Sequence, residues 1–223
     1  MRYTLRAVTV IPLEAVPVFP LSNVVLFPEQ RLPLHIFEPR YRQMVRDALE
    51  SQPFIVMAYQ SPKETGEPPA FAKIATIGKI IAHQRLSGGR FNIILEGQVR
   101  AAIEEVQSDK LYRRVRCIPI AEPQGEAADA PASERMALVS LVGRVMQRAR
   151  EKAPDIEFVL PEGVTAARLA FMVADKLLVD GAARQRVLEA QDAVTRLRRC
   201  TESVAALLSE IAPKSAGDAR NWS

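Results

Sequence analysis

The first 120 residues contain short apolar stretches in which hydrophobic and polar positions alternate. Phe91, Ile93 and Leu95 share one face of an extended chain, because successive side chains of a strand point to opposite sides. Short stretches of this kind, separated by turn residues such as Gly88-Gly89, are typical of a small antiparallel β-barrel. The expected strands are 16–21, 32–37, 54–59, 74–83, 91–95, 99–103 and 115–119.

One short helix is expected inside this β-rich part. Pro39 suits the first position of a helix, where its missing N–H is not needed, and Glu38 complements the positive end of the helix dipole. The helix should end near Ser51, because a residue that precedes a proline, here Gln52, avoids helical geometry. The positions at helical spacing that should face the core are Tyr41, Met44, Val45 and Ala48.

From residue 133 onward the hydrophobic positions recur every three or four residues, which predicts a bundle of helices. Ser133, Thr165 and Asp180 are good N-cap residues, so we expect helices to begin after them, and a last helix to begin near Asp192. The first helix is expected to bury Met136, Val139, Val142, Val145 and Met146. The last helix is expected to bury Val194, Leu197, Thr201, Val204, Leu208 and Ile211.

These patterns divide the chain into four parts. The predicted fold class is α+β, an N-terminal antiparallel β-barrel of about six strands with one short helix, followed by a C-terminal α-helical bundle. The expected parts are a barrel subdomain over 1–121, a linker over 122–132, a helical subdomain over 133–213 and a flexible tail over 214–223.

Composition places the chain among globular proteins. Its 223 residues are 48% hydrophobic and 25% charged, which suffices for a core without disulfides. No apolar run approaches the roughly 20 residues of a membrane-spanning helix, so we expect no membrane partner. The chain has two cysteines, Cys117 and Cys200, and no recognisable export signal. This combination predicts reduced thiols in a cytoplasmic protein. The net charge of +4 permits contact with nucleic acid but does not argue for it.

The sequence lacks the usual motifs of catalysis and cofactor binding. It has no phosphate-binding loop of the type G-x-x-x-x-G-K-[ST] or G-x-G-x-x-G, so no cofactor is expected. No metal site is expected either, because the two histidines, His35 and His83, are isolated. A thiol nucleophile formed by Cys117 and one of these histidines is an alternative to a core cysteine, which is the commoner role of a cysteine in an apolar strand.

Two stretches are candidate binding surfaces. Residues 16–42 concentrate prolines and large apolar side chains, most of which should be core, while Phe27 and its neighbours are candidates for an exposed patch. Arg40, Tyr41 and Arg42 either bind an anion at the helix start or brace the helix. Farther along, Tyr112 could stack on a base of a nucleic acid beside a basic face. That face would comprise Arg85, Arg90, Arg113, Arg114 and Arg116.

One long motif resembles a known family. The segment FPLSNVVLFPEQRLPLHIFEPRYRQMV, residues 19–45, resembles the opening motif of the Lon protease N-terminal, or substrate-binding, domain. Ile77-Gly78, Leu95-Glu96-Gly97 with Arg100, and the helical run 184–189 resemble later parts of the same pattern. The ATPase and Ser/Lys protease modules of Lon have no counterpart here, so the chain resembles the stand-alone Lon-domain proteins.

The resemblance implies a PUA-like β-barrel followed by a helical bundle, and a binding module rather than an enzyme. Its implied partner is an unfolded or degron-bearing polypeptide, or another protein. Because PUA-like barrels include RNA-binding modules, a nucleic acid remains the alternative partner, and an enzyme is the third hypothesis. No catalytic residue is implied. The candidate binding residues on the matched motif are Phe27, Pro28, His35, Phe37, Glu38, Arg40 and Tyr41.

Overall fold

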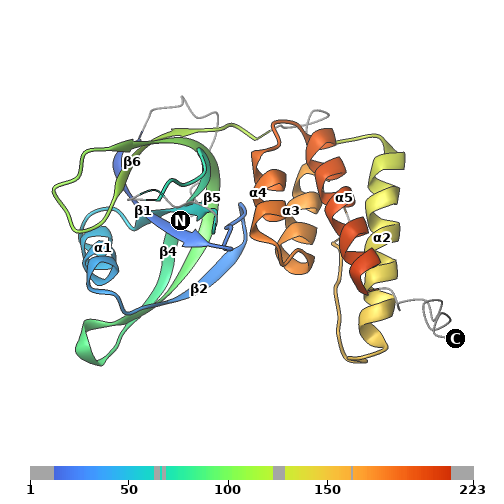
Figure 1. The fold of residues 1–223 in the computed structure, drawn as a ribbon, viewed down its shortest axis with the longest axis horizontal. Helices are drawn as coiled ribbons and strands as arrows, with labels where there is room; N and C mark the ends of the chain where they lie inside the picture. The colour runs from blue at the N-terminus through green and yellow to red at the C-terminus, as the bar shows by residue number, and fades with distance from the viewer. Residues whose placement is uncertain (1–12, 63–65, 67–68, 123–128, 162, 212–223) are drawn as a thin grey trace, which may run out of the picture.

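The structure is a computed structural model that describes residues 13–62, 66, 69–122, 129–161 and 163–211. A β-barrel with one helix lies beside a bundle of four helices (Figure 1). The predicted tail over 214–223 and most of the predicted linker lie outside the described residues. The strands are β1 (Leu13–Ser22), β2 (Arg31–Ile36), β3 (Phe54–Gln60), β4 (Ile74–Arg85), β5 (Phe91–Val106) and β6 (Arg114–Pro119). The helices are α1 (Pro39–Glu50), α2 (Ala132–Arg150), α3 (Ala166–Leu177), α4 (Gly181–Glu189) and α5 (Ala193–Ile211), with a short 3₁₀ turn, η1 (Ser87–Gly89).

The six strands form a sheet that closes on itself, which confirms the predicted fold class. The strand order is β2-β5-β4-β3-β1-β6, and an additional pairing of β5 with β6 completes the ring. One pair departs from the antiparallel expectation, because β1 runs parallel to β3. The chain passes through β2 and α1 between these two strands, and such a crossover returns it to the same end of the sheet.

Strand β5 is longer than the sequence predicted. The stretches 91–95 and 99–103 were expected as separate strands, but they form one strand of 16 residues. Its first half pairs with β2 and its second half pairs with β6. Gly97 does not end the strand, because its N–H donates to the Gln30 carbonyl at 2.9 Å and its carbonyl accepts from the Glu29 N–H at 2.7 Å.

Helix α1 packs against one end of the barrel interior and follows the prediction. It begins at Pro39 with Glu38 as N-cap, and Ser51 follows its last residue. Its four predicted core residues are all buried. They join a hydrophobic cluster that includes Phe91, Ile93 and Leu95, the three residues predicted to share one face of a strand. The apolar face of the first part of β5 is therefore the barrel's inner face, beneath α1.

The helical bundle confirms two predicted caps and corrects one. The Thr165 and Asp180 side chains accept hydrogen bonds from the first turns of α3 and α4. The prediction that Ser133 caps the first helix is wrong, because α2 already begins at Ala132, with Pro131 in the N-cap position. None of the helices among the described residues is long and apolar enough to span a membrane.

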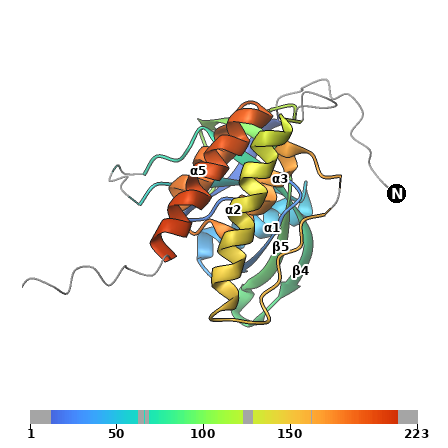
Figure 2. The same cartoon turned by 90° about the vertical axis from the view of Figure 1, so that its right-hand side faces the viewer.

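The buried faces of α2 and α5 are turned slightly from those predicted. Val142, Val145 and Met146 are buried as expected, but Leu138 is the fourth core residue of α2, whereas Met136 is 66% exposed. Figure 2 shows α2 and α5 lying against one another, so α2 buries only the narrow side that meets this neighbour. In α5, Leu197 and Val204 are buried as predicted, and the rest of the buried face is Ala193, Arg196 and Cys200.

A cluster of buried charges lies where the barrel meets the bundle. Arg100 of β5 and Arg196 of α5 are 1% and 0% exposed. Glu122 is paired with both: it accepts from Arg100 Nε, and its Oε2 lies 2.9 Å from Arg196 Nη1. Arg100 Nη1 also donates to two carbonyl oxygens of the bundle, those of Leu188 and Ala190, each at 2.7 Å. These bonds tie the barrel wall directly to α4 and α5.

Candidate functional site

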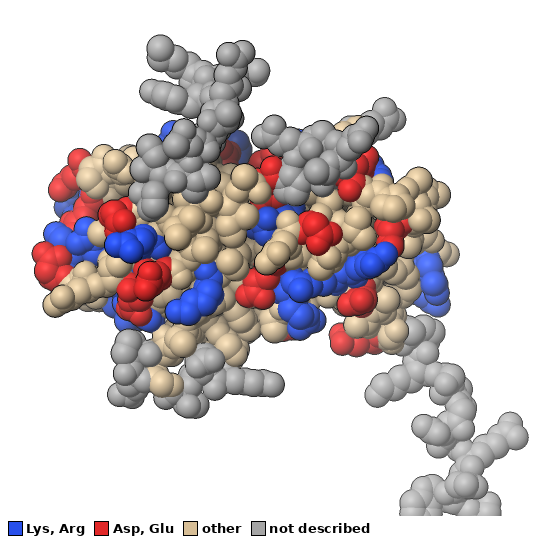
Figure 3. Space-filling model, turned by 90° about the horizontal axis from the view of Figure 1, so that it is seen from above, with Lys and Arg blue, Asp and Glu red and all other residues tan. Residues whose placement is uncertain are grey.

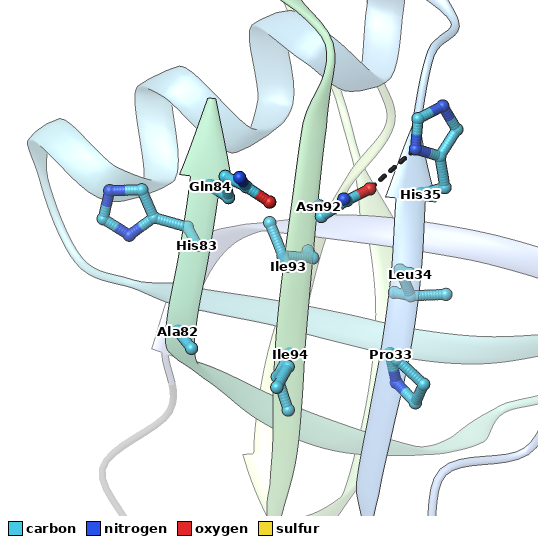
Figure 4. Close-up of a pocket in the computed structure, with 9 residues that line it drawn as sticks. All are labelled: Pro33, Leu34, His35, Ala82, His83, Gln84, Asn92, Ile93 and Ile94. Carbon is cyan, nitrogen blue, oxygen red and sulfur yellow. Dashed lines mark hydrogen bonds between the residues drawn. The ribbon is translucent and has the colours of Figure 1, made fainter. Parts of the chain in front are cut away.

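A shallow groove of about 520 Å³ lies on the surface of the barrel, over strands β2, β5 and β4. In the strand register, Ile94 of β5 lies between Pro33 of β2 and Ala82 of β4. Two residues closer to the hairpin that joins β4 and β5, Asn92 lies between His35 and Gln84 (Figure 4). The groove is lined by Pro33, Leu34, His35, Ala82, His83, Gln84, Asn92, Ile93 and Ile94.

The apolar floor of the groove follows from the alternation of β5. Phe91, Ile93 and Leu95 point inward and are buried, so Asn92 and Ile94 point outward. A strand position that faces the solvent is usually occupied by a polar residue. Here the position is occupied by Ile94, whose apolar side chain is 36% exposed. With the ring of Pro33 and the methyl group of Ala82 beside it, Ile94 gives the groove an uncharged, apolar surface.

The second row of the groove is polar and leads to an exposed aromatic ring. His35 Nδ1 and Asn92 Oδ1 lie 2.7 Å apart in a hydrogen bond, which links the imidazole on β2 to the Asn92 side chain on β5 (Figure 4). The Phe37 ring stacks on this imidazole with its centroid 6.1 Å away. Phe37 is 61% exposed, an unusual state for a phenylalanine. Two of the predicted site residues, His35 and Phe37, therefore lie together at the groove.

Three other predicted residues line a separate cleft of about 340 Å³ between β1, the start of α1 and the loop before β6. Glu38 and Arg40 form an ion pair there, with Arg40 Nη2 2.9 Å from Glu38 Oε2. The guanidinium of Arg40 lies 4.4 Å from the centroid of the Tyr41 ring. Burial raises the pKa of the Tyr41 hydroxyl above its usual range. The contacts of Arg40 match the predicted alternative in which these side chains brace the helix.

The remaining two predicted residues, Phe27 and Pro28, are buried, which corrects the expectation of an exposed patch around Phe27. The Phe27 side chain is 0% exposed. Its ring lies 5.3 Å from that of Phe171 in α3, and the Arg184 guanidinium lies 5.5 Å from its centroid. Phe27 thus joins the barrel to the bundle, because the loop that carries it faces α3 and α4. The resemblance identifies the motif but does not tell which of its apolar residues are covered.

The hypothesis of a thiol nucleophile does not fit this arrangement. Cys117 is fully buried in a cluster of apolar barrel residues, and this burial raises the pKa of its thiol to about 12. His35 and His83 instead line the groove on the barrel surface. Among the described residues, no group of three or more histidine, cysteine or acidic side chains could hold a metal ion.

The predicted basic face is not assembled as a binding surface for bases. Tyr112 is buried and donates from its hydroxyl to Asp47 at 2.9 Å, so its ring is not open to stacking. The neighbouring arginines have acidic partners: Arg113 pairs with Glu105, Arg114 with Asp109 and Arg116 with Glu14. On the face seen from above, acidic and basic side chains are interspersed (Figure 3). Only Arg85 and Arg90 of the predicted set have no carboxylate partner among the described residues.

Sequence reasoning missed the groove residues Ile94, Asn92 and Gln84. A signal for Ile94 was present, because it is an apolar residue on the outward face of a strand whose inward face was already identified. Nothing in the sequence placed it beside Pro33, since the pairing of β2 with β5 joins residues about 60 positions apart.

The chain is similar in sequence to known proteases over most of its length. The family model described as the ATP-dependent protease La (Lon) substrate-binding domain matches residues 15–206. The chain is 25% identical over 193 residues to Lon protease 2 of Bdellovibrio bacteriovorus and 28% identical over 179 residues to the Lon protease of Heliobacterium modesticaldum. These alignments cover 82% and 77% of this chain but only 23% and 22% of the two proteases.

Two solved structures share the fold. The N-terminal domain of a Lon protease from the Mycobacterium avium complex superposes with a TM-score of 0.61 at 18% identity, covering 86% of this chain and 98% of that one. A Lon N-terminal domain protein from Xanthomonas campestris gives a TM-score of 0.60 at 20% identity, covering 84% of this chain and 96% of the other. At these identities the likeness establishes the fold alone.

Proposed function

Because the chain belongs to the family of Lon substrate-binding domains, we propose that it is a non-catalytic module that holds exposed apolar segments of other polypeptides. The chain spans less than a quarter of the Lon proteases that it matches, so the proposal concerns recognition and not their whole activity. Two buried free cysteines support a reducing compartment, and we place the protein in the cytoplasm.

The groove over β2, β5 and β4 supports this proposal most directly. It offers an apolar floor around Ile94 and an exposed aromatic ring, Phe37, at its side. Exposed apolar surface beside polar side chains is typical of a surface that binds another protein. The His35–Asn92 row supplies polar groups that can bond to the backbone of a bound segment, while the floor accepts its apolar side chains.

The groove also lacks the arrangement that chemistry on a peptide bond would require. Its two histidines have no serine or cysteine among the residues that line it, so no nucleophile and base lie together there. The cysteine that was considered as a nucleophile is buried elsewhere, in the barrel. This supports a role in holding a polypeptide rather than cutting it.

Replacing Ile94 and Phe37 together by serine is expected to weaken binding of an unfolded polypeptide by about tenfold or more. Covering one large apolar side chain contributes roughly 1.5–3 kcal/mol, so loss of two exposed apolar contacts should be readily measured. Fluorescence anisotropy with labelled, reduced and carboxymethylated α-lactalbumin checks this. The labelled polypeptide should remain intact during the titration, with or without ATP.

The matched control is Val159→Ser, which removes an apolar side chain that is 75% exposed on the loop between α2 and α3, away from the groove. This variant should bind like the unaltered protein. Circular dichroism and the thermal midpoint show whether each variant is folded. Equal binding by the double variant and the unaltered protein, with both folded, would refute the groove as the site.

A further inference from the structure

Strand β2 leaves one of its two edges unpaired. It is the end strand of the order β2-β5-β4-β3-β1-β6, with β5 as its neighbour. The ring of strands closes without it, because residues 91–96 of β5 pair with β2, whereas residues 101–106 pair with β6. In Figure 4, β2 carries Pro33, Leu34 and His35 and lies on the outer side of β5. Its other edge faces no strand in the described part of the chain.

The register of the sheet identifies the backbone groups that lie on this free edge. The Gly97 N–H donates to the Gln30 carbonyl at 2.9 Å, so Gln30 directs its backbone carbonyl toward β5. Along an antiparallel strand, residues that bond to the partner alternate with residues whose N–H and C=O groups point away from it. Every second residue of β2 from Leu32 onward therefore bonds to β5. The residues that direct their backbone groups to the free edge are Arg31, Pro33 and His35.

Pro33 agrees with this assignment. Proline has no N–H, so within a sheet it is tolerated where the N–H would point to solvent. The free edge therefore offers two N–H groups, those of Arg31 and His35, and the carbonyl groups of all three residues. No described residue bonds to these groups, and the three residues are exposed. The edge is thus open to the backbone of another chain.

We propose that β2 binds an extended segment of another polypeptide as an additional strand of the sheet. Such a segment carries the N–H and C=O groups that the edge lacks, and peptides add to open sheet edges in this way. This inference rests on the function proposed above, since the partner is again an unfolded polypeptide. It adds the conformation in which the polypeptide is held and the main-chain contacts that hold it beside the groove.

The two faces of β2 specify the side chains of the bound segment. Leu32 and Leu34 lie on the inner face and are only partly buried against the hydrophobic cluster beneath α1. Every second side chain of an added strand would lie beside these leucines and cover the rest of their apolar surface. The side chains between them would lie on the outward face, next to Pro33 and His35. The edge therefore favours segments in which apolar and polar residues alternate.

A second copy of this chain fits the edge less well than another polypeptide does. In a symmetric antiparallel pair of β2 strands centred on Pro33, the two prolines would face one another, and neither could donate to the other's carbonyl. A shifted register would separate the prolines but shorten the pairing of a strand of 6 residues. A segment with any other residue opposite Pro33 donates to its carbonyl and lacks only one bond.

Amide hydrogen exchange, followed by two-dimensional NMR of the ¹⁵N-labelled protein, tests the proposal. The probe is a peptide of alternating valine and serine with a lysine at each end. In the free protein, the Arg31 and His35 amides should exchange rapidly. When the peptide is present at about nine times its dissociation constant, their exchange should slow about tenfold, because only the unbound protein exchanges. The Leu32 and Leu34 amides, which already bond to β5, should be slow in both states.

Backbone methylation of the peptide provides matched controls. One version carries N-methyl groups on its serines and another on its valines, and both keep every side chain. Alternate N–H groups of a strand point to opposite sides, so only one of the two sets can bond to β2. One methylated peptide should therefore fail to protect Arg31 and His35 while the other still protects them. Equal protection by all three peptides, or its loss with both methylated ones, would overturn the proposal.

The variant Pro33→Val adds a third N–H to the free edge. It should tighten binding of the unmethylated peptide by about two- to tenfold, the usual effect of one hydrogen bond. Binding of the methylated peptide that cannot pair with the edge should stay as weak as before. An affinity for the unmethylated peptide that does not change would overturn the proposal.

Two further results would assign the edge to a different occupant and overturn the inference. Slow exchange of Arg31 and His35 in the free protein at every concentration would show that the chain itself covers the edge. Slowing that grows with protein concentration would show that a second copy does. If these amides stay unprotected while labelled α-lactalbumin still binds, the edge is wrong and the proposed function stands. If no unfolded polypeptide binds, both fail.

Discussion

Replacing Arg100 by methionine is expected to lower the free energy of unfolding by about 3–5 kcal/mol. Arg100 is buried and donates to the carbonyl oxygens of Leu188 and Ala190 as well as to Glu122. Methionine fills much of the volume but leaves these carbonyl groups without their donor, and buried polar groups without partners are costly. Urea denaturation followed by circular dichroism measures the change.

The matched control for this substitution is Arg148→Met. Arg148 lies 3.2 Å from Glu151, but both side chains are largely exposed. Such a surface pair contributes less than about 1 kcal/mol, so this variant should unfold nearly like the unaltered protein. If Arg100→Met proves as mild as Arg148→Met, the buried charge cluster does not hold the barrel to the bundle.

Replacing Gly97 by alanine is expected to cost about 3 kcal/mol of stability, the upper end of the usual cost of overpacking. A Cβ atom at this position would lie 2.9 Å from the carbonyl carbon of Phe27 and 3.2 Å from the Cα of Pro28. These are backbone atoms, so no side chain can turn aside to make room. The loop that carries Phe27 would have to move away from β5, and thermal unfolding would report a lower midpoint.

Gly143→Ala is the control and should change stability in the opposite direction. Gly143 lies inside α2, and a Cβ atom there would meet no atom within 4 Å apart from its chain neighbours and the backbone of its own helix. Because alanine favours a helix more than glycine does, this variant should gain up to about 1 kcal/mol. A Gly97→Ala variant as stable as the unaltered protein would show that the loop at Phe27 does not pack closely against Gly97 of β5.

Local signals in the sequence predicted the elements well. Pro39 and Glu38 identified the start of α1, and the helical spacing identified its buried side, because both depend on neighbouring residues. The caps of α3 and α4 were found for the same reason. Such signals need no knowledge of how distant parts of the chain meet.

Features that depend on distant contacts could not be predicted in the same way. The parallel pairing of β1 with β3 is set by the path of the chain through β2 and α1. The buried side of α2 is set by its contact with α5, which left Met136 exposed against expectation. Arg100 and Arg196 are charged residues, which are rarely fully buried. Their position is explained by Glu122, by the carbonyl groups around them and by the Phe171 ring, and all of these contacts join distant parts of the chain.

The candidate site was predicted in part. The motif of residues 35–41 contains His35 and Phe37, which lie at the groove, together with three residues of a separate cleft. Phe27 belongs to the same motif but lies in the core. The sequence shows that a phenylalanine is present, but whether another element covers it depends on the docking of the bundle. The binding role of the groove stays a prediction.

The central claim is that the outward face of β2, β5 and β4 holds the polypeptide, and methyl NMR tests it most directly. Protein labelled at its isoleucine, alanine and methionine methyl groups is titrated with an unfolded polypeptide such as reduced, carboxymethylated α-lactalbumin. The methyl signals of Ile94 and Ala82, which line the groove, should shift or broaden, while that of Met136 on the exposed side of α2 stays unchanged. Changes at Met136 with Ile94 and Ala82 unaffected would place the binding surface on the bundle and contradict the account.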